Sequence, residues 1–178
     1  FGPIQKLCRE LDVEYHIEPS NIAKIVFDIR KESNPCSLCA KLRRGMLCDT
    51  AKKLGANKIA LGHHFDDAVQ TFMLNLFYEG RLGCFSPVTY LDRSDVTVIR
   101  PFIYAQEKDL SYFTSNAELP VVESECPANK KTEREEMKAL LVSLERENKG
   151  LRHRIFGAMQ KAGIDGYKEA KLKEYDDE

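Results

Sequence analysis

A single stretch about a third of the way along the chain limits the fold more than any other. Residues 58–62 (KIALG) have the composition of a short, compact strand that ends in glycine. Residues 63–67 (HHFDD) then lead into an amphipathic helix, whose apolar side is formed by Val69, Phe72, Met73, Leu76 and Phe77. A strand, a glycine turn and a helix in this order are typical of α/β proteins, in which ligands bind at the carboxyl ends of the strands.

The remaining pattern extends this alternation along the chain. Apolar spacing predicts helices at 4–11, 22–29, 38–54 and 107–118, and further strands at 13–17, 96–103 and 120–122. We therefore predict an α/β fold with a mostly parallel sheet and flanking helices over residues 1–128. A capping box at Thr132 and Glu135 and a restart after Gly150 predict a helical appendage at 129–166. The charged residues 167–178 are expected to form a disordered tail.

Composition excludes some classes of function and leaves others open. A chain of 178 residues with 43% hydrophobic content can bury one core, and a net charge of -1 gives no global attraction to nucleic acid or anionic membrane. Residues 41–58 nevertheless hold six basic side chains and one acid. This segment is either a local phosphate-binding surface or the solvated face of a helix. Six cysteines without a secretory leader or a long apolar run indicate a reducing, cytoplasmic compartment.

Three of the cysteines have the arrangement of metal ligands. Cys36 and Cys39 form a C-x-x-C pair at a predicted helix start, and Cys126 lies far downstream beside a proline. Three converging thiolates would leave one coordination position open, which is typical of reactive metal sites. A zinc site with a fourth ligand is the alternative, with Cys8, Cys48, Cys84 and the histidines as unpaired candidates. A thioredoxin-like redox pair fits less well, because it needs no third cysteine.

The residues after the central strand offer a second set of polar groups. We expect Asp66 to be the N-cap of the following helix and Asp67, in its first turn, to be a ligand for a metal ion or a nucleotide. His63 and His64 should face opposite ways, so that one of them at most points at a ligand.

Taken together, these segments resemble the tRNA 2-thiocytidine synthetases. The similarity lies in residues 35–45 (PCSLCAKLRRG), 61–67 (LGHHFDD), 98–102 (VIRPF) and 124–128 (SECPA), in that order. The resemblance implies an adenine-nucleotide α-hydrolase-like fold of the PP-loop ATP pyrophosphatases. It also implies that Cys36, Cys39 and Cys126 ligate a [4Fe-4S] cluster with one iron open. The remaining implied site residues are Gly62, His63 and Asp67 beside ATP and its Mg²⁺, with Arg43, Arg44 and Asp67 in catalytic roles.

The function that this resemblance implies is ATP-dependent thiolation of cytidine 32 in the tRNA anticodon loop. The enzyme would adenylate the base, release pyrophosphate and receive sulfur from a donor such as a cysteine desulfurase. It could form a homodimer, and no membrane is involved. The family's Ser-Gly-Gly-x-Asp-Ser loop is missing from these residues, so we expect the chain to be a C-terminal portion that does not hold ATP alone. A zinc-stabilised tRNA-binding module and a thiouridine-forming relative are the alternatives.

Overall fold

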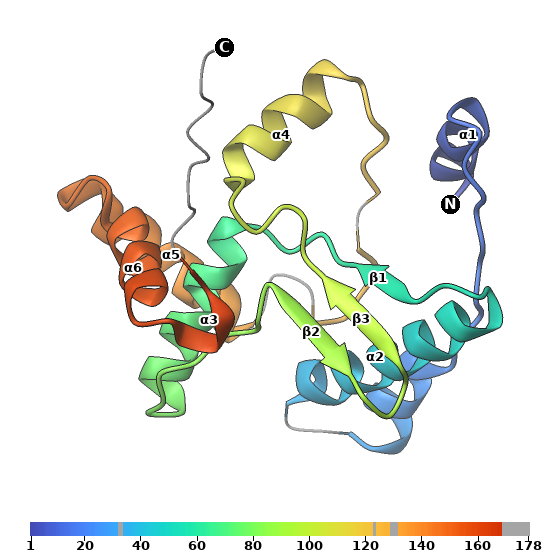
Figure 1. The fold of residues 1–178 in the computed structure, drawn as a ribbon, viewed down its shortest axis with the longest axis horizontal. Helices are drawn as coiled ribbons and strands as arrows, with labels where there is room; N and C mark the ends of the chain where they lie inside the picture. Colours follow the sequence, from blue (N-terminus) through green and yellow to red (C-terminus); the bar gives the residue numbers. More distant parts are fainter. Residues whose placement is uncertain (32–33, 123, 129–131, 169–178) are drawn as a thin grey trace, which may run out of the picture. The chain divides into compact units, whose positions relative to one another are not determined.

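The structure, a computed structural model, describes residues 1–31, 34–122, 124–128 and 132–168 (Figure 1). Helices predominate, and three short strands form one sheet. The elements are α1 (Gly2–Glu10), the π-helical segment η1 (Lys24–Ile29), α2 (Pro35–Lys53), β1 (Lys58–Ala60), α3 (Phe65–Tyr78), β2 (Val88–Leu91), β3 (Val96–Ile99), α4 (Glu107–Asn116), α5 (Glu133–Glu147), α6 (Leu151–Lys161) and the 3-10 turn η2 (Ile164–Gly166).

The predicted helices are present close to their predicted positions. Helix α2 begins where the sequence signals a start, because Asn34 caps it by accepting the Ser37 N–H (3.4 Å) and Pro35 occupies its first position. It ends just before Gly55, which has a positive φ of 69° that favours glycine. The C-x-x-C pair therefore lies at the start of α2, as predicted.

The sheet is small and mixed, with strand order β1-β3-β2. The Thr97 N–H donates to the Asn57 carbonyl (3.0 Å) and the Leu61 N–H to the Ile99 carbonyl (2.9 Å), so the bonds advance in the same direction along β1 and β3. This is the parallel pattern. Strands β2 and β3 form an antiparallel hairpin around residues 92–95, in which Asp95 has a φ of 47°. The α/β fold class is confirmed.

Individual strands differ from the sequence prediction. Residues 13–17 and 120–122 are not strands, and both Val13 and Ile17 are 56% exposed, so their alternation does not reflect a half-buried sheet face. Strand β3 ends at Ile99 and does not continue to residue 103, because Pro101 has no N–H to donate. Strand β2 is absent from the sequence prediction, because its four residues carry little apolar periodicity of their own.

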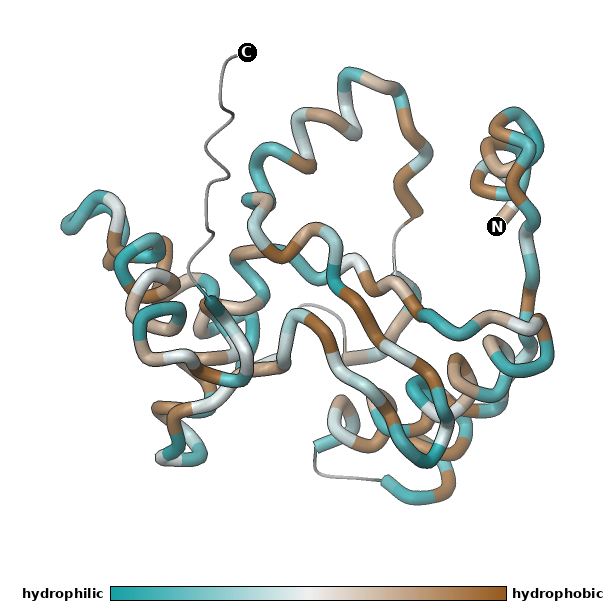
Figure 2. The backbone as a smooth tube through the Cα atoms, in the orientation of Figure 1, coloured by the Kyte–Doolittle hydropathy of each residue, from teal (hydrophilic) through white to brown (hydrophobic). Residues whose placement is uncertain are grey.

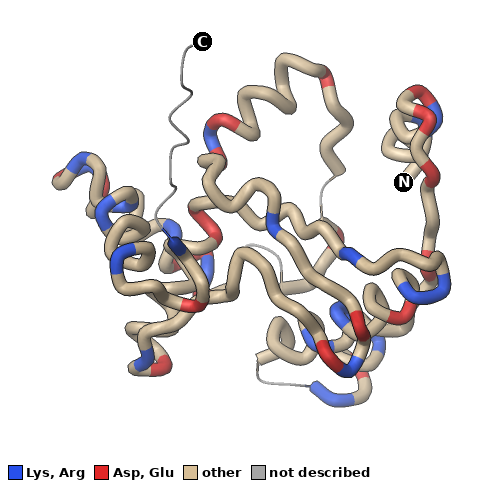
Figure 3. Tube along the Cα trace, viewed as in Figure 1, with Lys and Arg blue, Asp and Glu red and all other residues tan. Residues whose placement is uncertain are grey.

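The chain divides into two compact units, each built from several stretches of sequence. Unit 1 comprises residues 1–60, 90–98 and 105–132. Within it α2 packs against β1 and η1, with Val26, Cys48 and Ala51 buried. Figure 2 shows the hydrophobic residues along β3, and Figure 3 the basic residues along α2. Helices α1 and α4 bury none of their residues.

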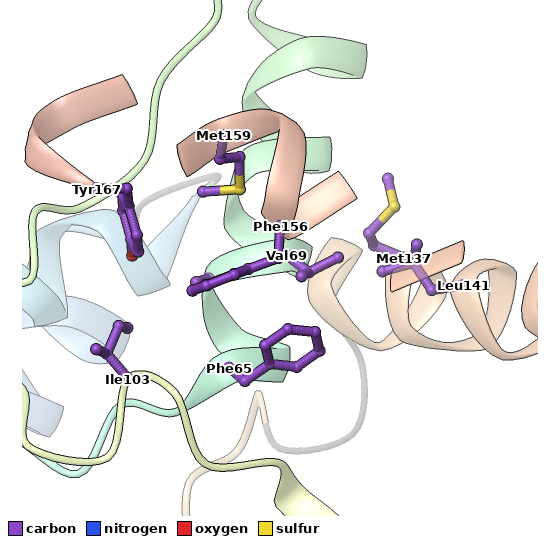
Figure 4. Close-up of a cluster of buried hydrophobic side chains, with 9 residues drawn as sticks. Phe65, Val69, Ile103, Met137, Leu141, Phe156, Met159 and Tyr167 are labelled. Atoms are coloured by element: carbon purple, nitrogen blue, oxygen red, sulfur yellow. The ribbon is translucent and has the colours of Figure 1, made fainter. Parts of the chain in front are cut away.

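Unit 2 comprises residues 61–89, 99–104 and 133–178, and its core forms around α3 (Figure 4). Helices α5 and α6 pack against the apolar side of α3. Phe156 lies between Phe65 and Tyr167, with ring centroids 4.8 and 5.5 Å apart. The cluster consists of Phe65, Ala68, Val69, Ile103, Met137, Leu141, Phe156, Met159 and Tyr167. The helical segment after residue 132 is thus an integral part of this core.

The C-terminal end of unit 2 is anchored to its interior. Tyr167, the first residue of the predicted tail, is completely buried, and its hydroxyl lies 3.6 Å from the Cys84 Sγ. The Asp165 carboxylate accepts the Cys84 N–H (2.6 Å). Residues 169–178 of the predicted tail lie outside the described residues. In the described part of the chain, no helix is both long and apolar enough to cross a membrane.

Candidate functional site

The polar residues at the start of α3 in unit 2 form a compact hydrogen-bonded group. The N-cap is His64, in extended conformation, and not Asp66 as the sequence suggested. Asp67, at the third helical position, accepts the backbone N–H of His64 (3.0 Å) and so completes one side of a capping arrangement. The helix begins at Phe65, two residues after the histidine pair starts, so Asp66 already lies inside it.

Asp66 links α3 to helix α6 through a buried ion pair. Its carboxylate is buried and accepts from Arg152 Nη1 of α6 at 2.6 Å. The Nε of the same guanidinium lies 3.6 Å from Glu145 of α5. Hydrogen bonds from the Arg152 and Gly150 N–H groups hold the pKa of Glu145 below its usual value. This network joins α3 to the connection between α5 and α6.

Asp67 is held by a different arginine. Arg134, in the first turn of α5, donates from Nη1 to Asp67 Oδ1 (3.1 Å) and from Nη2 to Thr71 Oγ1 (3.0 Å). The His64 Nε2 lies 3.4 Å from the other carboxylate oxygen. Asp67 is therefore fixed in orientation by contacts from both α3 and α5.

His63 packs beside an aromatic ring. Its ring centroid lies 4.8 Å from that of Phe85, and the Arg100 guanidinium carbon lies 4.7 Å from the same Phe85 centroid. Burial lowers the pKa of His63, opposed in part by the nearby Asp67 charge and reinforced by Arg100. The imidazole is consequently harder to protonate than a solvent-exposed histidine. His63 Nδ1 and Arg100 Nε are buried without a hydrogen-bond partner among the described residues.

Gly62 precedes this group and is exposed. An added Cβ would meet no atom within 4 Å, and the backbone has no positive φ there. The described residues therefore do not themselves require glycine at this position.

The three predicted metal ligands all belong to unit 1. Cys36 and Cys126 are exposed, Cys39 is partly exposed, and all three thiols are free. The Cys126 N–H donates to Ser124 Oγ (3.3 Å). Among residues 1–31, 34–122, 124–128 and 132–168, no group of three or more His, Cys, Asp or Glu side chains is placed to hold a metal ion. The donor set thus suits an iron-sulfur cluster chemically, but the described residues do not gather it.

Arg43 and Arg44 lie on α2, one turn beyond Cys39, and both are exposed. Arg43 follows Cys39 by four residues and Cys36 by seven, so these three positions share one helix face. Neither arginine forms an ion pair with any residue that the structure describes. They remain available for an external anion.

The sequence did not point to the arginines of unit 2. Arg134 and Arg152 reach the start of α3, while Arg100 lies over the Phe85 ring that also packs against His63. The three arginines come from separate segments, so no local spacing connects them. The arginine at position 100 lies in the segment VIRPF noted above, but only the fold shows its aromatic partner.

The model of the PP-loop domain matches residues 2–145, which is most of the chain. This chain belongs to the PP-loop domain family.

Several curated proteins are similar in sequence to this PP-loop chain. It is 38% identical over 159 residues to the tRNA-cytidine(32) 2-sulfurtransferase of Geobacter sulfurreducens, covering 88% of the chain and 62% of that protein. Identity to the sulfurtransferases of the same name from Ralstonia pickettii and Pseudomonas putida is 39% and 40%, each over 85% of the chain. Those matches cover 49% and 56% of the two relatives. The chain thus spans about half to three fifths of their length.

A solved structure has the same PP-loop fold. It is the U34-tRNA thiolase NcsA from Methanococcus maripaludis with its [4Fe-4S] cluster, with a TM-score of 0.72 and 25% sequence identity. The match covers 90% of this chain and 55% of that one.

Proposed function

We propose that this chain is part of an enzyme that thiolates tRNA by replacing the C2 oxygen of cytidine 32 with sulfur. The observation that carries the proposal is the 38–40% identity, over 82–88% of the chain, to proteins named for this reaction. The solved uridine thiolase supports the general chemistry but is 25% identical, so a thiouridine-forming enzyme is the second candidate.

The reaction requires activation of a poor leaving group. The C2 carbonyl of cytosine is urea-like, and adenylating its oxygen with ATP converts it to AMP, a good leaving group, while pyrophosphate is released. Sulfur at the sulfide level then bonds to C2 as the C–O bond breaks and AMP departs. The target base lies in an anticodon loop, where it is unstacked more easily than in a duplex.

In unit 2, Gly62, His63 and Asp67 are the proposed ATP-binding residues. The exposed backbone at Gly62 allows close approach of a nucleotide, and in its neutral form the His63 imidazole can accept or donate a hydrogen bond without adding charge. A carboxylate has about four acceptor positions. Asp67 uses two of them for Arg134 and the His64 N–H, which leaves oxygen lone pairs for the Mg²⁺ that accompanies ATP.

In unit 1, Cys36, Cys39 and Cys126 are the proposed ligands of a [4Fe-4S] cluster. Free, solvent-accessible thiols suit this role, and the similar NcsA structure contains such a cluster. When bound, a cluster with three protein ligands supplies one iron that can carry sulfide. Arg43 or Arg44 would stabilise negative charge that develops on the transferred phosphate.

The exposed basic residues of α2 are the proposed contact for the tRNA backbone. We place the enzyme in the cytoplasm, with a sulfur donor such as a cysteine desulfurase as its second partner and possible homodimerisation. The glycine-rich loop expected for the ATP phosphates is not among these 178 residues, so assays should use the native full-length protein.

The test compares two cysteine substitutions in anaerobically purified full-length protein. Cys126→Ser should abolish bound iron, acid-labile sulfide and formation of 2-thiocytidine, measured by mass analysis of tRNA nucleosides. Cys48→Ala is the matched control, because Cys48 is buried in unit 1. This variant should retain the bound iron and sulfide and should still form 2-thiocytidine. Thiouridine as the product would favour the second candidate. Stoichiometric zinc, tRNA binding and no sulfur transfer would favour a zinc-stabilised binding module.

A further inference from the structure

We propose that Arg134 is a positioning residue for Asp67, so that helix α5 contributes directly to the nucleotide-binding edge. The inference rests on the proposed function, because it assigns Asp67 to MgATP. No motif of the sequence singled out Arg134, and it lies on the helical segment that was expected to be an appendage.

Asp66 and Asp67, the two neighbouring carboxylates at the start of α3, differ in how far they are buried. Each is paired with an arginine from the C-terminal helices, Asp66 with Arg152 and Asp67 with Arg134. The Asp66 side chain is only 5% exposed, so its arginine compensates a buried charge. The Asp67 side chain is 22% exposed and its arginine 40% exposed, so this pair lies within reach of a ligand.

Arg134 is itself fixed in place. Its two terminal nitrogens donate to Asp67 and Thr71, which are four residues apart and therefore lie one turn apart on the same face of α3. A planar guanidinium that spans two fixed acceptors has little rotational freedom. Lysine could replace one of these bonds but not both.

These contacts fix the direction of the Asp67 carboxylate. Arg134 holds one oxygen at 3.1 Å, and the His64 N–H holds the other at 3.0 Å. The carboxylate plane is therefore set before any ligand arrives, and its unused lone pairs point in fixed directions. Without Arg134, Asp67 could rotate, and binding of MgATP would have to order it.

The test measures MgATP binding and the Mg²⁺ dependence of activity in native full-length protein. Arg134→Gln should raise the dissociation constant of MgATP about tenfold, in line with the loss of an outer-shell partner, and should shift the Mg²⁺ dependence to higher concentration. Arg134→Lys should recover part of the affinity. Thr71→Val should weaken binding less than Arg134→Gln, and the double variant should be no weaker than Arg134→Gln alone.

Arg152→Gln is the matched control, since it removes the arginine from the adjacent carboxylate. It should lower the unfolding temperature and leave the MgATP dissociation constant of the folded protein within about twofold. Wild-type affinity in Arg134→Gln, or equal affinity losses in both variants that follow their unfolding temperatures, would overturn the inference. Failure of the unaltered protein to bind MgATP would overturn the proposed function and the inference with it.

Discussion

At the scale of single residues, the surroundings of His63 disfavour the protonated, charged form of its imidazole. Its ring packs against Phe85, its Nδ1 is buried without a partner among the described residues, and burial is the main cause of its lowered pKa. Asp67 opposes this shift, while Arg100, Arg134 and His64 add to it. The folded protein therefore binds a proton at His63 less readily than the unfolded chain.

This imbalance predicts a pH-dependent stability. As pH falls below the ordinary histidine pKa of about 6.5, the unfolded state takes up a proton that the folded state resists, so the free energy of unfolding decreases. Each unit of pKa difference corresponds to about 1.4 kcal/mol. His63→Asn should therefore show a smaller loss of stability between pH 7.5 and 5.5 than the unaltered protein, measured by urea denaturation.

His16→Asn provides the comparison, because His16 is an exposed histidine of unit 1. The lowered pKa of Glu145 also makes the protein less stable as pH falls. That loss occurs only below the ordinary glutamate range, outside the window from pH 7.5 to 5.5. Identical pH dependence in the His63→Asn and unaltered proteins would contradict the assignment.

Single residues also show how far sequence reasoning reaches. The C-x-x-C pair could be placed at the start of α2 because Asn34 and Pro35 are local signals. The prediction of Asp66 as the N-cap is wrong because histidine is an uncommon cap, and only the fold shows that Asp67 performs the capping. The arginine partners of both carboxylates depend on packing of distant helices, which local spacing does not encode.

At the scale of elements, helix α2 combines accessible cysteines at its start with buried residues further along. Cys36 and Cys39 lie near its N-terminal end, while Cys48 and Ala51 are buried in its second half. Lys41, Lys52 and Lys53 are exposed, and none forms an ion pair with a described residue. The two interpretations of this basic segment, an RNA-binding surface or a solvated helix face, make different predictions.

If α2 binds the tRNA backbone, the double variant Lys41→Gln, Lys52→Gln should weaken tRNA binding. It should also reduce the slope of log affinity against log salt concentration, by roughly 0.7–0.9 for each tRNA phosphate that the variant no longer neutralises. Lys161→Gln, at the exposed end of α6, is the control and should leave the slope unchanged. An unaltered slope in the double variant would show that this part of α2 is a solvated face.

Strands illustrate the limit of prediction at the same scale. β1 is predictable because it is a compact apolar run before a glycine turn, whereas β2 becomes a strand through pairing with β3. The alternation at residues 13–17 finds no pairing strand in the described structure. Strand formation is decided by neighbours, so short segments are predicted less well than helices with their own caps.

At the scale of the whole molecule, burial is distributed unevenly. The core of unit 2 includes five residues of α5, α6 and the C-terminal segment, whereas α1 and α4 bury none. We predict that backbone amides in the central turns of α3 and α6 exchange with solvent at least about tenfold more slowly than those of α1 and α4. Hydrogen exchange followed by mass spectrometry measures this, and uniform protection across these helices would contradict it.

The order in which unit 2 receives its parts has a consequence for biosynthesis. The chain passes between the units five times, and α3 is translated well before residues 133–167, which cover its apolar side. While the ribosome is still adding those residues, the helix has no lasting cover, and a chain stopped before α5 would expose Phe65, Val69 and their neighbours to other nascent proteins. Completion of the last helices, rather than of the cysteine-bearing segment, is the step that should release the chain from chaperones.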